Sequence, residues 1–143
     1  MKRFLWLLLT VICIAFIFYN SSLVGDTSSQ ASNLLATWLA GALQLVDISI
    51  SPKQLNIDLR TLAHFCEFAM LGICLLNLFS EWRIGRRSAT GYIFFIGLAV
   101  AVLDEYIQLL TPGREGRLAD VGLDFCGIFF VWLCAEVWSW SKH

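Results

Sequence analysis

Residues 91–110 read GYIFFIGLAVAVLDEYIQLL, and this stretch decides the class of the protein. Residues 91–103 carry no charged side chain. As a helix, the whole stretch would be roughly 30 Å long, which is the thickness of a bilayer's hydrocarbon core. Its last two turns nevertheless contain Asp104, Glu105 and Gln108. Because charged groups inside a bilayer are costly, the stretch predicts a transmembrane helix whose polar end has a task beyond spanning.

The rest of the chain is apolar in the same way. Its 143 residues are 58% hydrophobic with a mean hydropathy of +0.71, whereas soluble domains are about 45–50% apolar. A chain this small cannot hide such an excess in a core surrounded by water. Apolar runs predict further spans at about 4–19, 62–79 and 118–138. We therefore expect an all-α polytopic membrane protein with four transmembrane helices, forming a single domain over residues 1–143.

The connection between the first two spans carries a fifth apolar pattern. At about 32–46, apolar residues recur near helical spacing, but the segment is too short and too polar at its flanks to span. We expect an amphipathic helix in the membrane interface, or a re-entrant segment. The first span ends in Phe18 and Tyr19, not in the small residues of a signal-peptide cleavage site, so we expect it to stay uncleaved.

The distribution of charge predicts the orientation and excludes some functions. The net charge is -1, so the chain lacks the basic field that nucleic-acid binding requires. With the N-terminus in the cytoplasm, basic residues gather on short cytoplasmic segments: Lys2, Arg3, Arg83, Arg86, Arg87 and Lys142. The positive-inside rule then places both termini in the cytoplasm. The five cysteines lie in apolar stretches without a C-x-x-C pair, which predicts neither disulfides nor a cysteine zinc site.

Polar side chains gather at the predicted outer ends of three spans. Glu67, Asp104 and Asp124 would each lie roughly 8–9 Å deep at helical rise. The neighbours that complete the cluster follow at i, i+3 or i, i+4 spacing, which puts them on one face of each helix. We expect an outward-facing polar pocket over an apolar floor, with these binding residues: Arg60, His64, Glu67, Asp104, Glu105, Gln108, Arg114, Arg117, Asp120 and Asp124. The alternative is a set of ion pairs that only fixes helix register.

Two chemistries of the carboxylates remain open. His64 with Glu67, Asp104 and Asp124 has the ligand types of a divalent metal site, although H-x-x-E spacing often occurs by chance. The same four residues are the candidates for acid and base catalysis, because carboxylates held close together share protons. No G-x-S-x-G elbow, Walker loop or H-E-x-x-H helix is present. Neither a resident cofactor nor an enzymatic activity is therefore assigned.

A third chemistry involves the turn between the last two spans. Arg114 and Arg117, with the backbone amides around Gly113 and Gly116, are suited to hold a phosphate or a carboxylate. An anionic lipid headgroup or a cell-wall precursor at the outer leaflet would fit this arrangement. A third function, that of a transporter or proton-coupled carrier, would need polar residues through the inner half of the membrane. The sequence offers only Asn77 and Glu136 there, which argues against this function.

Several of these residues form a pattern of fixed spacing. Residues 104–108 read DEYIQ, residues 112–114 read PGR, and Asp120, Asp124 and Gly127 follow. This resembles the D-E-x-x-Q, P-G-R and D-x-x-x-D-x-x-G core of VanZ-like proteins. The upstream residues Arg60, His64, Glu67 and Gly72 resemble the family's R-K-x-x-H-x-x-E motif and the small residue after it, with Thr61 in place of the lysine. Residues 19–22, YNSS, are similar to the polar serine patch after the family's first helix.

The resemblance covers nearly the whole chain. It implies where the protein is located and which phenotype it is linked to, but it implies no biochemical reaction. It implies an integral protein of the bacterial cytoplasmic membrane with a four-helix core and a link to resistance against teicoplanin-type glycopeptides. Two functions follow as hypotheses. The first is a protein of the cell envelope whose pocket binds an anionic lipid or wall precursor and modulates antibiotic susceptibility. The second is a membrane-embedded enzyme that acts on a lipid-linked substrate through the His/Glu/Asp cluster. The oligomeric state is left open.

Overall fold

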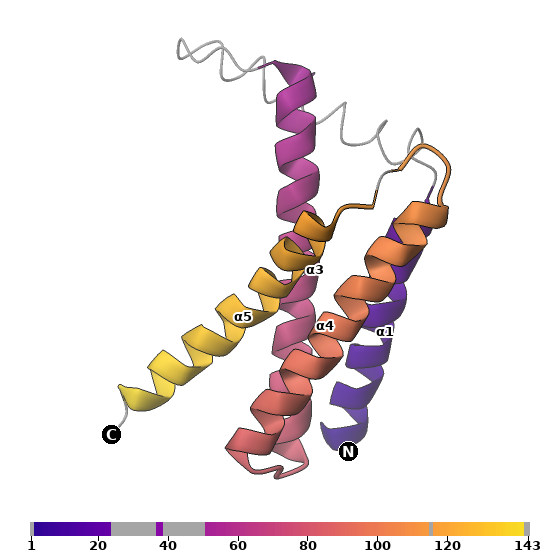
Figure 1. Ribbon diagram of the computed structural model, residues 1–143. Helices are drawn as coiled ribbons and strands as arrows, with labels where there is room; N and C mark the ends of the chain where they lie inside the picture. Colours follow the sequence, from indigo (N-terminus) through magenta and orange to yellow (C-terminus); the bar gives the residue numbers. More distant parts are fainter. Residues whose placement is uncertain (1, 24–36, 39–50, 115, 142–143) are drawn as a thin grey trace.

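The computed structural model describes residues 2–23, 37–38, 51–114 and 116–141. This part of the chain contains α1 (Lys2–Ser22), α3 (Pro52–Glu81), α4 (Arg86–Leu110) and α5 (Leu118–Trp140) (Figure 1). All four helices are long and apolar enough to cross a membrane. The expectation of an all-α, multi-pass membrane protein is therefore confirmed. The amphipathic helix expected at 32–46 lies outside the described residues, apart from Thr37 and Trp38, which are helical and exposed.

Helix α3 begins at Pro52 and not near residue 62, where the apolar run starts. The Ser51 hydroxyl accepts a hydrogen bond from the Gln54 backbone N–H at 3.2 Å, and proline occupies the first helical turn. Both features favour a helix start at this point. The helix has 30 residues and is about 45 Å long, so it exceeds the hydrocarbon thickness of a bilayer. Figure 1 shows its N-terminal half rising beyond the other helices.

Helix α3 is the centre of the bundle, because it packs against α1, α4 and α5. Helix α4 also packs against both α1 and α5. Ile17, Phe68, Leu71, Ala101 and Ile128 are fully buried between the helices. Lipid tails are as apolar as these side chains, so close van der Waals packing is what holds such helices together. Large apolar side chains on the outer faces remain exposed, as expected for surfaces that contact lipid.

Helices α3 and α5 approach each other closely at Gly127. A Cβ atom at this position would lie 2.5 Å from the Phe65 carbonyl oxygen and 3.0 Å from the Ala69 backbone nitrogen. Only a residue without a side chain permits this approach. Phe65 follows His64 directly, and Gly127 lies less than one turn after Asp124. The contact therefore fixes the separation between His64 and Asp124.

Polar contacts tie the helices together at the end of the bundle that holds the start of α1. Arg86 forms an ion pair with Glu136 across α4 and α5. The Arg3 Nε donates a hydrogen bond to the Glu81 carbonyl oxygen at 2.9 Å. The start of α1, the α3–α4 connection and the end of α5 thus lie at one end (Figure 1). The opposite end, formed around the connection 111–117, is called the loop end below.

Candidate functional site

A cavity of about 290 Å³ opens at the loop end, between α3, the α4–α5 connection and the start of α5. It brings together most of the binding residues expected from the sequence: Arg60, His64, Glu105, Gln108, Arg114, Arg117, Asp120 and Asp124. Glu67 and Asp104 do not line the cavity. Each of these two carboxylates instead accepts a hydrogen bond from α1. The polar ends of the three helices therefore converge, as their helical spacing predicted.

Asp104 is the most deeply buried carboxylate of the site, with 0% of its surface exposed. Its Oδ1 accepts a hydrogen bond from the Ser21 hydroxyl at 2.5 Å, and its Oδ2 accepts one from the Gln108 side-chain amide at 2.9 Å. Two donors on different helices thus hold the carboxylate in one orientation. A buried polar group with several partners rigidifies its surroundings, because each lost partner would carry a large cost.

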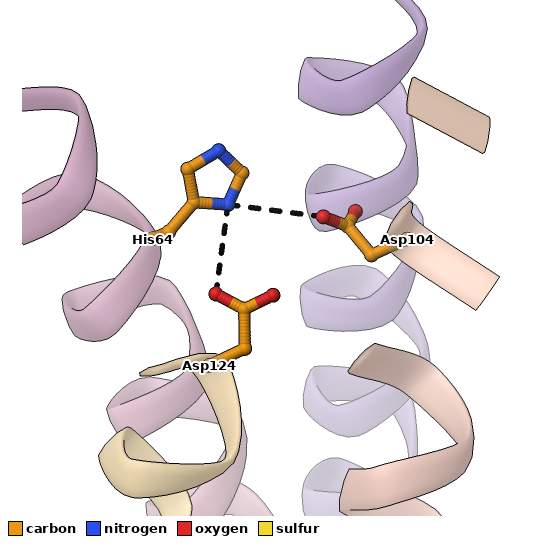
Figure 2. Close-up of side chains that lie close together, drawn as sticks. All are labelled: His64, Asp104 and Asp124. Atoms are coloured by element: carbon orange, nitrogen blue, oxygen red, sulfur yellow. Dashed lines mark ion pairs between the residues drawn. The ribbon is translucent and has the colours of Figure 1, made fainter. Parts of the chain in front are cut away.

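Asp104, Asp124 and His64 form the centre of the site, which is called the His–Asp cluster below (Figure 2). The His64 Nδ1 lies 3.7 Å from Asp104 Oδ2 and 3.9 Å from Asp124 Oδ1. Figure 2 shows both carboxylates pointing toward this nitrogen, Asp104 from α4 and Asp124 from α5. The distances exceed hydrogen-bond length. Asp124 is 1% exposed, and within the described part of the chain neither of its carboxylate oxygens has a hydrogen-bond partner.

The end of α1 contributes to the site in a way the sequence analysis missed. The Asn20 side-chain amide donates to Glu67 Oε1 at 2.8 Å, and the Asn20 carbonyl accepts from Arg114 Nη2 at 2.9 Å. The Thr111 hydroxyl donates to the Ser21 carbonyl at 3.1 Å. The expected first span stopped at Tyr19, but α1 continues to Ser22 and carries these groups into the bundle. The polar patch at 19–22 was the available signal.

Three arginines line the cavity. Arg60 lies one turn before His64 on α3, and Arg114 and Arg117 belong to the connection at the loop end. Burial lowers the pKa of the Arg114 guanidinium from its ordinary value, but arginine remains protonated in proteins. The Arg117 backbone N–H donates to Glu105 Oε2 at 2.7 Å, which anchors the connection to α4. The cavity is thus lined by three arginines and by the carboxylates of Glu105, Asp120 and Asp124.

Comparison with known proteins identifies the family of the chain. A family model described as VanZ/LLP1 matches residues 5–139, nearly the whole chain. No curated protein and no solved structure compared with the chain matches it. The matched region contains every residue of the cavity and, apart from the first three residues of α1 and the last residue of α5, all four helices of the bundle. The four transmembrane helices and the family match together establish that the chain belongs to the VanZ/LLP1 family.

Proposed function

We propose that the cavity binds the phosphate-bearing headgroup of an anionic lipid at the outer face of the bacterial cytoplasmic membrane. A membrane phospholipid and a lipid-linked cell-wall precursor share this chemistry. Binding would modulate the envelope and, through it, susceptibility to glycopeptides such as teicoplanin. The observation that supports the proposal most directly is that three arginines, Arg60, Arg114 and Arg117, line a cavity of about 290 Å³.

The three arginines of the cavity have the right chemistry for phosphate. An arginine fork pairs with two phosphate oxygens at once, and it gives up less hydration than a lysine ammonium. Gly113 has a positive φ of 76° in the turn between Arg114 and the end of α4, and such turns present backbone N–H groups to anions. Leu110 and Leu118, 68% and 88% exposed, flank this connection. They offer an apolar surface for the acyl or prenyl chain attached to the headgroup.

The orientation follows from the distribution of basic residues. Arg83, Arg86 and Arg87 lie at the end of the bundle opposite to the cavity, on or beside the short α3–α4 connection. By the positive-inside rule, this distribution supports a cytoplasmic position for this end and for both termini. The cavity would then open toward the cell surface, where wall precursors and glycopeptides meet.

Binding of an anionic lipid tests the proposal directly. We expect native mass spectrometry of the detergent-solubilised protein to show retention of phosphatidylglycerol over phosphatidylcholine. The Arg117→Gln variant should retain the anionic lipid about tenfold less, because a charge-assisted hydrogen bond is worth roughly 1.5–3 kcal/mol. Arg87→Gln, an exposed arginine at the opposite end, is the matched control and should behave as the parent. Equal retention of both lipids by the parent would contradict the proposal.

Teicoplanin susceptibility tests the consequence for the cell. We expect a sensitive host that expresses the parent chain to tolerate more teicoplanin than a host that expresses Asp104→Asn at equal membrane level. The amide cannot keep both acceptor contacts of a carboxylate that receives hydrogen bonds from Ser21 and Gln108. Equal protection by both chains would show that Asp104 is structural. If the parent gave no protection, the link to glycopeptide susceptibility would be wrong, and only the proposed lipid binding would remain.

A second function is favoured by the His–Asp cluster. A membrane-embedded enzyme would use Glu67, Asp104, Asp124 and His64 on a lipid-linked substrate, with one group accepting a proton and another donating it. The observation in its favour is that His64 faces two buried carboxylates at 3.7 and 3.9 Å. An enzyme should lose all turnover of the bound lipid in Asp124→Asn, whereas a binding protein should release the same lipid unchanged.

A further inference from the structure

We propose that His64, Asp104 and Asp124 bind one divalent transition-metal ion, of which Zn²⁺ and Mn²⁺ are the best matches. The inference does not depend on the lipid proposed above, because the ion's protein ligands come from α3, α4 and α5 alone. One imidazole nitrogen with two carboxylates is a donor set that suits both ions. Three different helices supply these donors, so the ion would also link the helices to one another.

The geometry of the cluster fits a single ion. One donor atom from each of the three residues lies within 4.8 Å of the other two. In a bound site, donor atoms about 2.0–2.2 Å from the ion are about 3–3.5 Å apart. The 3.7 and 3.9 Å separations between His64 Nδ1 and the two carboxylates are slightly larger than this. Small rotations of the His64 and Asp124 side chains would close the difference while Asp104 keeps its two hydrogen bonds, and both carboxylates already point toward the nitrogen (Figure 2).

The Asp124 carboxylate is the observation that points to a ligand. It is 1% exposed, it points into the cluster, and among the described residues neither oxygen has a hydrogen-bond partner. Burying a carboxylate without partners is expensive, and such groups in native proteins are paired or coordinate metals. A histidine nitrogen 3.9 Å away is too distant to donate a hydrogen bond. A cation between the three side chains would satisfy both Asp124 and His64.

The surroundings of Asp104 resemble the support that metal ligands receive. Ser21 and Gln108 each donate a hydrogen bond to its carboxylate. Such outer partners fix the orientation of a ligand and are typical of metal sites. His64 and Asp124 also line the cavity. The coordination positions that the protein leaves open would face the cavity, where water or a phosphate oxygen can reach the ion.

The balance of charge also favours a cation. The carboxylates of Glu105, Asp120 and Asp124 line the cavity with the three arginines. Asp104 and Glu67 add two further carboxylates behind its wall. The acidic side chains therefore outnumber the basic ones in this region. A divalent ion between His64, Asp104 and Asp124 would offset the excess and leave the three arginines of the cavity for an anion.

Metal titration of the purified, tag-free protein tests the inference. After treatment with a chelator, the detergent-solubilised parent should bind about one equivalent of Zn²⁺ in calorimetric titration, and Mn²⁺ should compete. Asp124→Asn and His64→Gln should each bind at least about tenfold more weakly, since even outer partners of a metal ligand contribute about 10–100-fold. Asp58→Asn removes an exposed carboxylate from α3 and should bind as the parent does.

X-ray absorption at the zinc edge of the loaded parent provides a measurement that needs no variant. We expect nitrogen and oxygen ligands with one imidazole, and sulfur ligation would overturn the assignment. The inference also fails if the parent binds neither ion, or if well-folded Asp124→Asn binds Zn²⁺ as tightly as the parent. These titrations contain no phospholipid, so their outcome is separate from that of the lipid experiment. Loss of lipid selectivity with intact Zn²⁺ binding would contradict only the proposed function.

Discussion

Replacing Gly127 by alanine is expected to destabilise the bundle by about 3 kcal/mol, the upper part of the usual range for overpacking. The new Cβ would lie 2.5 Å from the Phe65 carbonyl oxygen. That neighbour is backbone within α3 and cannot rotate away as a side chain can. Helices α3 and α5 must therefore separate, and the distance between His64 and Asp124 must grow with them. Denaturation of the detergent-solubilised protein, followed by circular dichroism, measures the change.

Gly122 provides the matched control on the same helix. Its Cβ would meet nothing within 4 Å among the described atoms. Alanine is the better helix former by up to about 1 kcal/mol, so Gly122→Ala should be neutral or slightly stabilising. If the two variants had the same stability, the close approach at Gly127 would not be a determinant of the fold.

Loss of the Ser21 hydroxyl is expected to have the second-largest effect. Ser21 is fully buried and donates to the equally buried Asp104 at 2.5 Å. Ser21→Ala leaves one carboxylate oxygen without this donor, and a hydrogen bond to a charged group contributes roughly 1.5–3 kcal/mol. We expect the free energy of unfolding to fall by about that amount. The same denaturation measurement detects it.

The neighbouring serine separates this effect from a general loss of helix stability. Within the described part of the chain, the Ser22 hydroxyl donates to the Tyr19 carbonyl of its own helix, and Ser22 is exposed. Ser22→Ala should therefore change the free energy of unfolding by less than about 0.5 kcal/mol, as is usual for surface substitutions. A similar loss in both serine variants would mean that the contact between Ser21 and Asp104 contributes little.

The sequence was sufficient to predict the four helices and the meeting of their polar ends. Long apolar runs specify spans through their length alone, and i, i+3 or i, i+4 spacing places His64 and Glu67 on one face. Depth and face are properties of each helix by itself, and both can be read without knowing its neighbours. Together with the alternating direction of the spans, they led to the expectation that Arg60, His64 and Asp124 share one pocket, and these three residues line the cavity.

Contacts between helices could not be predicted in the same way. Asn20 and Ser21 read as the polar start of a loop, because nothing in their local sequence reveals that Glu67 and Asp104 would receive their hydrogen bonds. Gly127 stood out as part of a motif, but its role depends on the backbone of α3 at Phe65. Hydrogen bonds and close contacts between helices depend on how two helices pack together. The periodicity of one helix does not indicate this packing.

The contact between Ser21 and Asp104 has a consequence for how the chain enters the membrane. An aspartate in a transmembrane segment costs up to about 2.5–3.5 kcal/mol during insertion, and a partner that donates a hydrogen bond reduces this cost. Helix α1 precedes α4 in the chain and supplies that donor from its last turn. Helix α4 therefore enters the bilayer most favourably once α1 is already in place. During biosynthesis, α1 would thus anchor the chain in the membrane and also lower the free-energy cost of inserting α4.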